Sequence, residues 1–320
     1  MKRKVFLSLL YTILLYIGTA TAQKRIVWEP VAIDSIVFLD QSRSNPLVRA
    51  LDTYPILHPI PLNAFMAAQP KGEVPDSLHQ LYEASAGTRP YVALYDFLHV
   101  GELNQRMLAG EASAAEADTL ERLLLGPLPY LMNDTTDEKV SLLGAFATMA
   151  AMQMYCLIKG RDVRLNFYQN CFVHVQTDSL NVTIDQVADM PFLPNVRLRI
   201  GGIRSQTPFT LQLRRPCWAV DAEPTIYING REEVLPVEAG YYTIRRRWNA
   251  GDEVFFSFNL QPRFEGERLL LGGVEYVAIE RDEAARDGVV YNRLGHPVFT
   301  VEGTRYLPAM DIGEAMPIEE

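Results

Sequence analysis

The chain has 320 residues and a formal net charge of −9, and 48% of its residues are hydrophobic and 22% charged. This balance is typical of a globular protein with one or two cores and excludes an intrinsically disordered chain. The excess of acidic residues makes nucleic acid a poor partner, because phosphate backbones bind basic surfaces.

Residues 1–22 have the pattern of a secretory signal peptide. Basic residues at positions 2–4 precede the apolar run 5–17, and small residues at 20–22 stand before Gln23. We expect a periplasmic or secreted mature protein that has no membrane span after the signal is removed. A retained membrane anchor is the alternative, although the run is shorter than the ~20 residues that a spanning helix needs.

Residues 23–160 are expected to form a proline-rich segment followed by helices. Frequent prolines up to about position 75 disfavour long helices and leave one short strand at Ser35–Leu39. Further on, a capping box begins at Ser113, and Thr136 is a suitable N-cap. The predicted helices span 76–84, 90–109, 113–126 and 136–160.

The last of these helices contains no charged residue between Val140 and Ile158. That length would allow a transmembrane span, but several polar and alanine residues lower its hydrophobicity. A buried core helix is therefore the favoured interpretation.

Residues 161–312 predict a β-sandwich, followed by a frayed tail at 313–320. Phe209, Leu211 and Leu213 alternate with polar residues, as in a strand with one buried face. The pair Asn229-Gly230 suits a type I′ turn. We expect the next two strands, 241–248 and 254–260, to form a hairpin, and short strands at 289–291, 298–301 and 306–307 to close the sheet.

Several of these segments resemble, in order and spacing, the β-sandwich that follows the catalytic barrel of glycoside hydrolase family 127, the β-L-arabinofuranosidases. The matching segments are 167–173, 209–219, 226–230, 240–244, 248–252 and 269–277. The resemblance covers roughly Glu138 to Met310. It implies an α+β fold in which a truncated helical part packs on an antiparallel β-sandwich.

Active members of that family hold zinc with one glutamate and three cysteines and use a cysteine thiolate as nucleophile, which is reasonable because zinc lowers the pKa of thiols. This chain has no Cys-Cys pair and no Glu-x-Cys, and the expected place near Leu143-Gly144 is apolar. The segment before Glu138 is also too short for a complete α-barrel. We therefore predict no catalytic residue of the family type, no metal and no cofactor.

Cys156, Cys171 and Cys217 are an odd number of cysteines for an oxidising compartment. Cys171 and Cys217 could form a disulfide, since both lie in the predicted sandwich. The alternative is that all three are buried as small hydrophobic residues.

Two kinds of side chain could bind or hydrolyse a carbohydrate. Exposed aromatic rings can stack on sugars, and the candidates are Trp218, Tyr241, Tyr242 and Trp248, although aromatic residues in strands usually fill a core. A two-carboxylate hydrolase could draw on Glu102, Glu116, Glu121 and Asp137, although helical acids usually form a solvated face.

We therefore expect a secreted, non-catalytic, carbohydrate-associated protein whose partner is a plant-type oligosaccharide or an envelope protein. Two alternatives remain open. One is a glycoside hydrolase that uses carboxylates between the helices and the sandwich, and the other is a structural subunit of the envelope.

Overall fold

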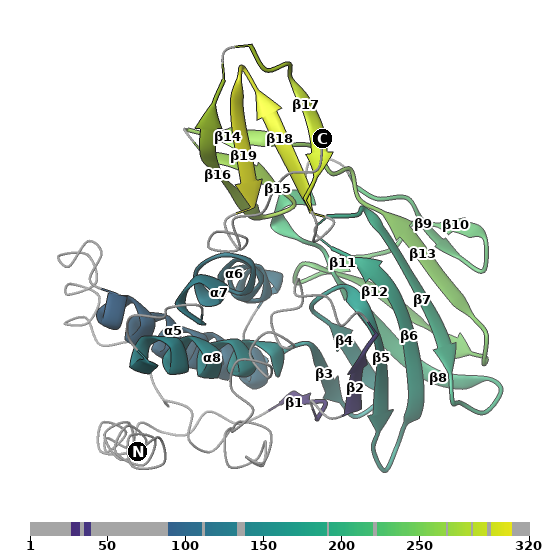
Figure 1. Cartoon of the computed structure of the whole chain (residues 1–320). Coiled ribbons are helices and arrows are strands. Elements are labelled where there is room, and N and C mark those ends of the chain that lie inside the picture. Colours follow the sequence, from purple (N-terminus) through teal and green to yellow (C-terminus); the bar gives the residue numbers. More distant parts are fainter. Residues whose placement is uncertain are drawn as a thin grey trace.

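A computed structural model describes residues 27–32, 35–39, 89–110, 113–132, 138–190, 192–219, 223–266, 268–282, 284–292 and 296–308. The expected signal peptide, the helix at 76–84, Asp137 and the tail at 313–320 lie outside these residues. In Figure 1 the helices lie beside a β-sandwich, and a smaller sheet lies above both. The fold is α+β, as predicted.

The described helices are α5 (Arg89–Ala109), α6 (Ala114–Leu125), α7 (Pro127–Met132) and α8 (Glu138–Met152). Helices α5 and α6 agree closely with the predicted bounds, whereas α7 was not predicted. Ser113 forms the predicted capping box, because its Oγ accepts a hydrogen bond from the Ala115 N–H while Glu116 accepts one from the Ser113 N–H. No helix in the described part of the chain is both long and apolar enough to cross a membrane.

The predicted extension of the last helix to Gly160 is wrong. Helix α8 ends at Met152, and residues Cys156–Lys159 form strand β3, which pairs with β4 (Asp162–Leu165). A fully buried strand and a fully buried helix are both apolar throughout, so the composition of this run could not separate them. Gly160 has a φ of 61° and serves the turn between the two strands.

Two sheets face one another in the sandwich. The first has the order β1-β3-β4-β8-β12-β11, and the second has the order β10-β9-β13-β7-β6-β5-β2. Their further strands are β1 (Glu29–Pro30), β2 (Ile36–Phe38), β5 (Gln169–Gln176), β6 (Asn181–Asp189), β7 (Asn195–Gly201), β8 (Thr207–Arg214), β9 (Ile226–Ile228), β10 (Arg231–Glu233), β11 (Val237–Glu238), β12 (Tyr241–Trp248) and β13 (Glu253–Ser257). Most pairings are antiparallel, but β4 and β8 run parallel.

The turn at Asn229-Gly230 forms as predicted, whereas the next predicted turn does not form a hairpin. Asn229 and Gly230 both have positive φ, 51° and 74°, and β9 and β10 pair across them. The expected hairpin of β12 and β13 is wrong, because β12 pairs with β8 in the first sheet and β13 with β7 and β9 in the second. The turn at residues 249–252 therefore carries the chain from one sheet to the other.

The last strands also differ from the prediction in their position. Strands do form near all three predicted places, but β17 (Gly288–Tyr291), β18 (Pro297–Val301) and β19 (Thr304–Pro308) belong to a third sheet. Its other strands are β14 (Arg263–Glu265), β15 (Arg268–Leu271) and β16 (Val274–Arg281). This sheet has its own small core, which includes Leu125 of α6, so it packs on the helices rather than closing the sandwich.

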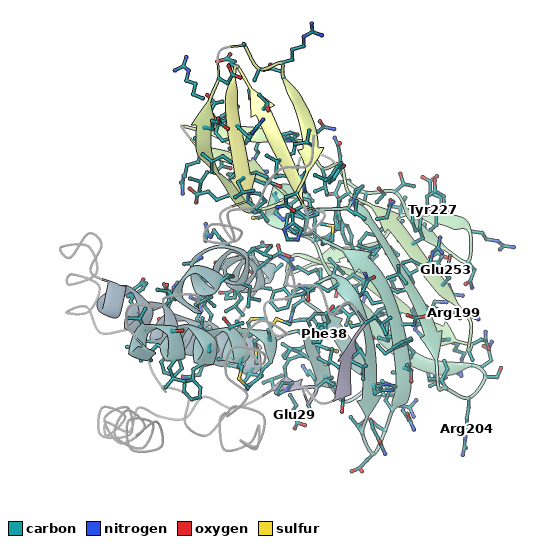
Figure 2. All side chains as sticks on the ribbon, viewed as in Figure 1. Glu29, Phe38, Arg199, Arg204, Tyr227 and Glu253 are labelled. Atoms are coloured by element: carbon teal, nitrogen blue, oxygen red, sulfur yellow. The ribbon has the colours of Figure 1, made fainter. Side chains whose placement is uncertain are left out.

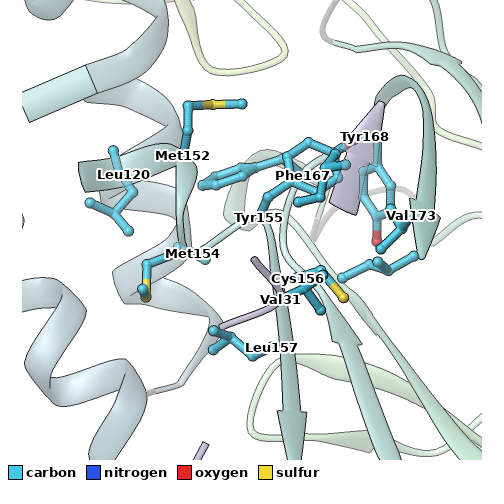
Figure 3. Packing of buried hydrophobic residues seen from close by; sticks show 14 of the residues in the cluster. Val31, Leu120, Met152, Met154, Tyr155, Cys156, Leu157, Phe167, Tyr168 and Val173 are labelled. Atoms are coloured by element: carbon cyan, nitrogen blue, oxygen red, sulfur yellow. The ribbon is translucent and has the colours of Figure 1, made fainter. Parts of the chain in front are cut away.

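The main core joins the helices to the sandwich. Tyr155, Phe167 and Tyr168 lie at this junction together with Met152 and Leu120 of the helices (Figure 3). The opposite side of the seven-stranded sheet is different, since it carries charged and aromatic side chains such as Arg199, Tyr227 and Glu253 (Figure 2).

Candidate functional site

A buried ionic cluster joins α6 to the sandwich. Asp118 and Glu121 lie three residues apart on one face of the helix, and both pair with Arg214 at the end of β8. The Arg214 side chain has no exposed surface, and those of the two acids are 11% and 10% exposed. We call these three residues the helix–sheet ion cluster.

Both carboxylates of this cluster use their second oxygen as well. Asp118 Oδ2 accepts a hydrogen bond of 3.2 Å from the Cys217 N–H, and Glu121 Oε2 accepts one of 3.5 Å from Trp218 Nε1. These donors lie on the short helical turn Cys217–Ala219, which follows β8 after a short connection. The cluster is therefore held from the helix, the strand and the turn together.

Charge and burial oppose each other within the cluster. Burial raises the pKa of Glu121, while Arg214 acts to lower it. Burial alone would lower the pKa of Arg214, but Glu121 and Asp118 outweigh burial and raise it, so Arg214 stays protonated. An arginine so firmly paired with two acids is suited to holding elements together.

A second polar group lies next to this cluster on the same face of the six-stranded sheet. The Arg164 guanidinium lies between two rings, with its carbon 4.1 Å from the centroid of Trp28 and 4.2 Å from that of Tyr241. Tyr241 donates a 2.7 Å hydrogen bond to Asn166 and is the register partner of Arg214. The group thereby connects Trp28, which precedes β1, with β4 and β12, and through the register partner Arg214 with β8.

The structure brings two of the four predicted aromatic residues to this region. Trp218 is partly exposed and contacts Glu121, while Tyr241 has no exposed surface. Tyr242 is 3% exposed, and its hydroxyl donates to Glu223. Trp248 has no exposed surface and stacks on Phe209 at 5.2 Å. Rings enclosed in a core offer no face to a sugar, and of the four predicted residues only Trp218 is partly exposed.

Two of the four predicted carboxylates are engaged in ion pairs. Glu116 serves the capping box and pairs with Arg106 at 2.6 Å, and Glu121 is held in the ion cluster. Glu102 lies on α5, and Asp137 is outside the described residues. Sequence reasoning missed Asp118 and Arg214, although the spacing of Asp118 and Glu121 already placed two acids on one helical face.

The three cysteines are free, so the suggested disulfide between Cys171 and Cys217 is not formed. Cys171 is buried and donates to Tyr155 Oη at 3.2 Å, whereas Cys217 is exposed. Burial raises the pKa of all three thiols, that of Cys171 to about 12. Among the described residues, no three His, Cys, Asp or Glu side chains gather in a way that could hold a metal ion.

Comparison with known proteins connects this architecture to one family. Residues 162–260 match the family model described as the middle domain of the GH127 β-L-arabinofuranosidases. This range runs from β4 through β13 and so takes strands from both sheets of the sandwich. The chain is GH127-like.

Solved structures agree with the GH127-like assignment at the level of the fold. A GH127 β-arabinofuranosidase superposes with a TM-score of 0.55 and 16% identity over 70% of this chain and 47% of its own. A GH127 β-L-arabinofuranosidase from Geobacillus stearothermophilus T6 superposes with a TM-score of 0.55 and 18% sequence identity, over 69% of this chain and 48% of its own. A third structure, described as a glycoside hydrolase, superposes with a TM-score of 0.54 and 15% sequence identity, over 69% of this chain and 50% of its own.

The GH127-like chain thus spans about half the length of these solved structures. No curated protein matches it.

Proposed function

We propose that this GH127-like chain is a secreted, non-catalytic protein that associates with carbohydrate. The observation that carries the proposal is how its cysteines are placed. The zinc of the family needs several thiolates around one ion, whereas among the described residues no three His, Cys, Asp or Glu side chains lie close enough to share a metal. These three residues do not fit the zinc group that the family resemblance implies.

The positions of the cysteines support the same conclusion. Cys156 and Cys171 lie in the main core, where Cys156 is surrounded by apolar side chains (Figure 3). Cys217 lies apart from them, on the turn beside the helix–sheet ion cluster. A substrate would have to enter the core to meet the first two thiols.

A glycosidase that uses carboxylates is the second candidate, since Asp118 and Glu121 lie together beside the partly exposed Trp218. Against it, both acids are engaged by Arg214, and Glu121 also accepts from Trp218. A general acid or base must be free to exchange a proton with its substrate. We therefore assign the ion cluster a structural role.

One experiment separates these candidates. Ligand-observed NMR of the secreted chain with arabino-oligosaccharides, with and without added zinc, detects binding and hydrolysis in the same sample. We expect line broadening and no new anomeric signals. Zinc-dependent release of arabinose would contradict the proposal. Turnover that persists without zinc and is lost in Glu121→Gln would favour the carboxylate mechanism.

Secretion is tested separately by the mass of the exported protein. Cleavage of the signal gives a mature chain that begins at Gln23. Retention of residues 1–22 on the exported chain would instead indicate a membrane anchor. Absence of sugar binding together with a co-purifying envelope protein would support the structural-subunit alternative.

A further inference from the structure

Two parallel rows of side chains cross the outer face of the seven-stranded sheet. The first row follows the register of four neighbouring strands and consists of Tyr227, Phe255, Arg197 and Val187. The two rings are partly exposed, with centroids 6.3 Å apart, and Val187 is 52% exposed. Neighbouring strands are ~4.8 Å apart, so the row is roughly 14 Å long.

The second row lies two residues further along each strand and is charged. Glu253 on β13, Arg199 on β7 and Asp185 on β6 are register partners in turn. Glu253 also pairs with Arg197 of the first row at 3.7 Å. Figure 2 labels Tyr227, Glu253 and Arg199 on the side of the sandwich that faces away from the helices.

The inner and outer faces of these strands differ as a binding surface requires. Along β13, Val254 and Phe256 have no exposed surface and fill the core, while Glu253 and Phe255, which alternate with them, are partly exposed. Phe255 is thus held on a strand whose other face is fixed by packing. Rigid strands position such groups more accurately than loops do.

The charges in these rows indicate the type of ligand. Arg197 and Arg199 are matched by Asp185 and Glu253, so the four residues carry no net charge. Glu232, the register partner of Tyr227 on β10, adds one acid at the end of the first row. Such a surface offers many hydrogen-bonding groups without attracting a polyanion, which suits an uncharged ligand.

We propose that this outer face binds a neutral oligosaccharide whose sugar rings lie on Tyr227 and Phe255 and whose hydroxyl groups bond to Arg197 and to the charged row. Sugar rings have an apolar C–H face that packs on aromatic rings, and hydroxyls that can both donate to carboxylates and accept from guanidinium groups. The length of the rows favours a short chain over a single sugar. This inference rests on the proposed association with carbohydrate and assigns it a surface.

Isothermal titration calorimetry of the full secreted chain tests the site. The probes are α-1,5-linked arabinopentaose and cellopentaose, with trigalacturonate as an acidic comparison. Tyr227→Ala and Phe255→Ala are each expected to weaken the binding of a neutral probe by about tenfold or more. The matched control is Phe264→Ala, because Phe264 is a 51% exposed aromatic residue on β14 in the third sheet.

A second pair of variants covers the case in which loss of a ring disturbs folding. Arg197 and Arg245 have side chains 59% and 57% exposed, and both lie on strands of the sandwich. Arg197→Ala should weaken binding and Arg245→Ala should not. Circular dichroism verifies that each variant is folded.

The possible outcomes distinguish a failure of the proposed binding surface from a failure of the proposed function. Binding that survives Tyr227→Ala, Phe255→Ala and Arg197→Ala would overturn the proposed surface and leave the association with carbohydrate intact. No binding of any neutral probe by the unaltered chain would overturn the proposed function and this site with it. Tighter binding of trigalacturonate than of the neutral probes would overturn the assignment to an uncharged ligand.

Discussion

Arg214 of β8 and Asp118 of α6 form a buried ion pair between a strand and a helix that are far apart in the sequence. The contact fixes the helical part against the sandwich. Glu121 completes it from the same face of α6.

Replacing Arg214 by Met should destabilise the chain by about 3–5 kcal/mol, because two buried carboxylates would lose their partner. Urea unfolding followed by circular dichroism measures the loss. The matched control is Arg245→Met, whose solvent-exposed pair with Glu238 should contribute much less to stability, because water screens both charges. Equal effects of the two substitutions would contradict the structural role of the ion cluster.

Gly240 should not tolerate a side chain, because it lies against the start of α6. Its φ is 82°, and an added Cβ would lie 2.6 Å from the Cβ of Ala114. Gly240→Ala should cost about 2 kcal/mol or more in unfolding free energy.

Gly230→Ala is its control. Gly230 also has positive φ, 74°, but an added Cβ there would meet no atom of the described residues within 4 Å. This substitution should cost only about 1 kcal/mol. The difference in unfolding free energy between Gly240→Ala and Gly230→Ala measures the clash with the helix. If the two costs were equal, α6 would not lie as close to the start of β12 as described.

Asp96 of α5 should make stability depend on pH. It is 4% exposed, its Oδ2 has no hydrogen-bond partner among the described residues, and burial raises its pKa to about 7. The folded state therefore keeps a proton that the unfolded state releases near pH 4. The contribution of Asp96 to the free energy of unfolding consequently falls as the pH rises from about 4 to about 7, by up to ~4 kcal/mol.

Asp96→Asn should remove this dependence. Its unfolding free energy should resemble that of the unaltered chain at pH 4 and exceed it at pH 8, as measured by urea unfolding at both values. An equal difference between the two proteins at both pH values would show that Asp96 is ionised in the folded state.

The thiols should differ in accessibility. A disulfide-exchange reagent at pH 8 should titrate Cys217 slowly in the folded chain, because Cys217 is exposed but its pKa is raised. Cys156 and Cys171 should react only in denaturant, where all three thiols should be counted. Fewer than three reactive thiols in denaturant would indicate a disulfide, and Cys217→Ser assigns the folded-state signal.

Elements determined by neighbouring residues could be predicted from the sequence. The capping box at Ser113 and the turn at Asn229-Gly230 depend on a few adjacent side chains and backbone angles, and both form as predicted. The choice between partners far apart in the chain could not be predicted. Strand β12 could have paired with β13 or β8, and its alternating pattern is the same in either sheet.

The candidate site shows the same limit. The sequence makes Trp248 and Tyr242 candidates for sugar stacking because strand aromatics can face solvent, but which face of β12 is covered depends on the opposite sheet and on the helices. Arg214 lies at the end of an alternating strand, where its neighbours in the sequence give no sign of burial. Its partners on α6 are neighbours only in the folded chain.

Strands β1 and β2 give the beginning of the described chain an architectural role. They are separated by only a few residues, yet β1 pairs with the edge strand β3 of one sheet and β2 with β5 of the other. The same short stretch therefore seals one open edge of each sheet. Since helices α5 to α8 lie between β2 and β3 in the sequence, each of these pairings closes a loop that contains all the described helices, which ties the helical part to both sheets of the sandwich.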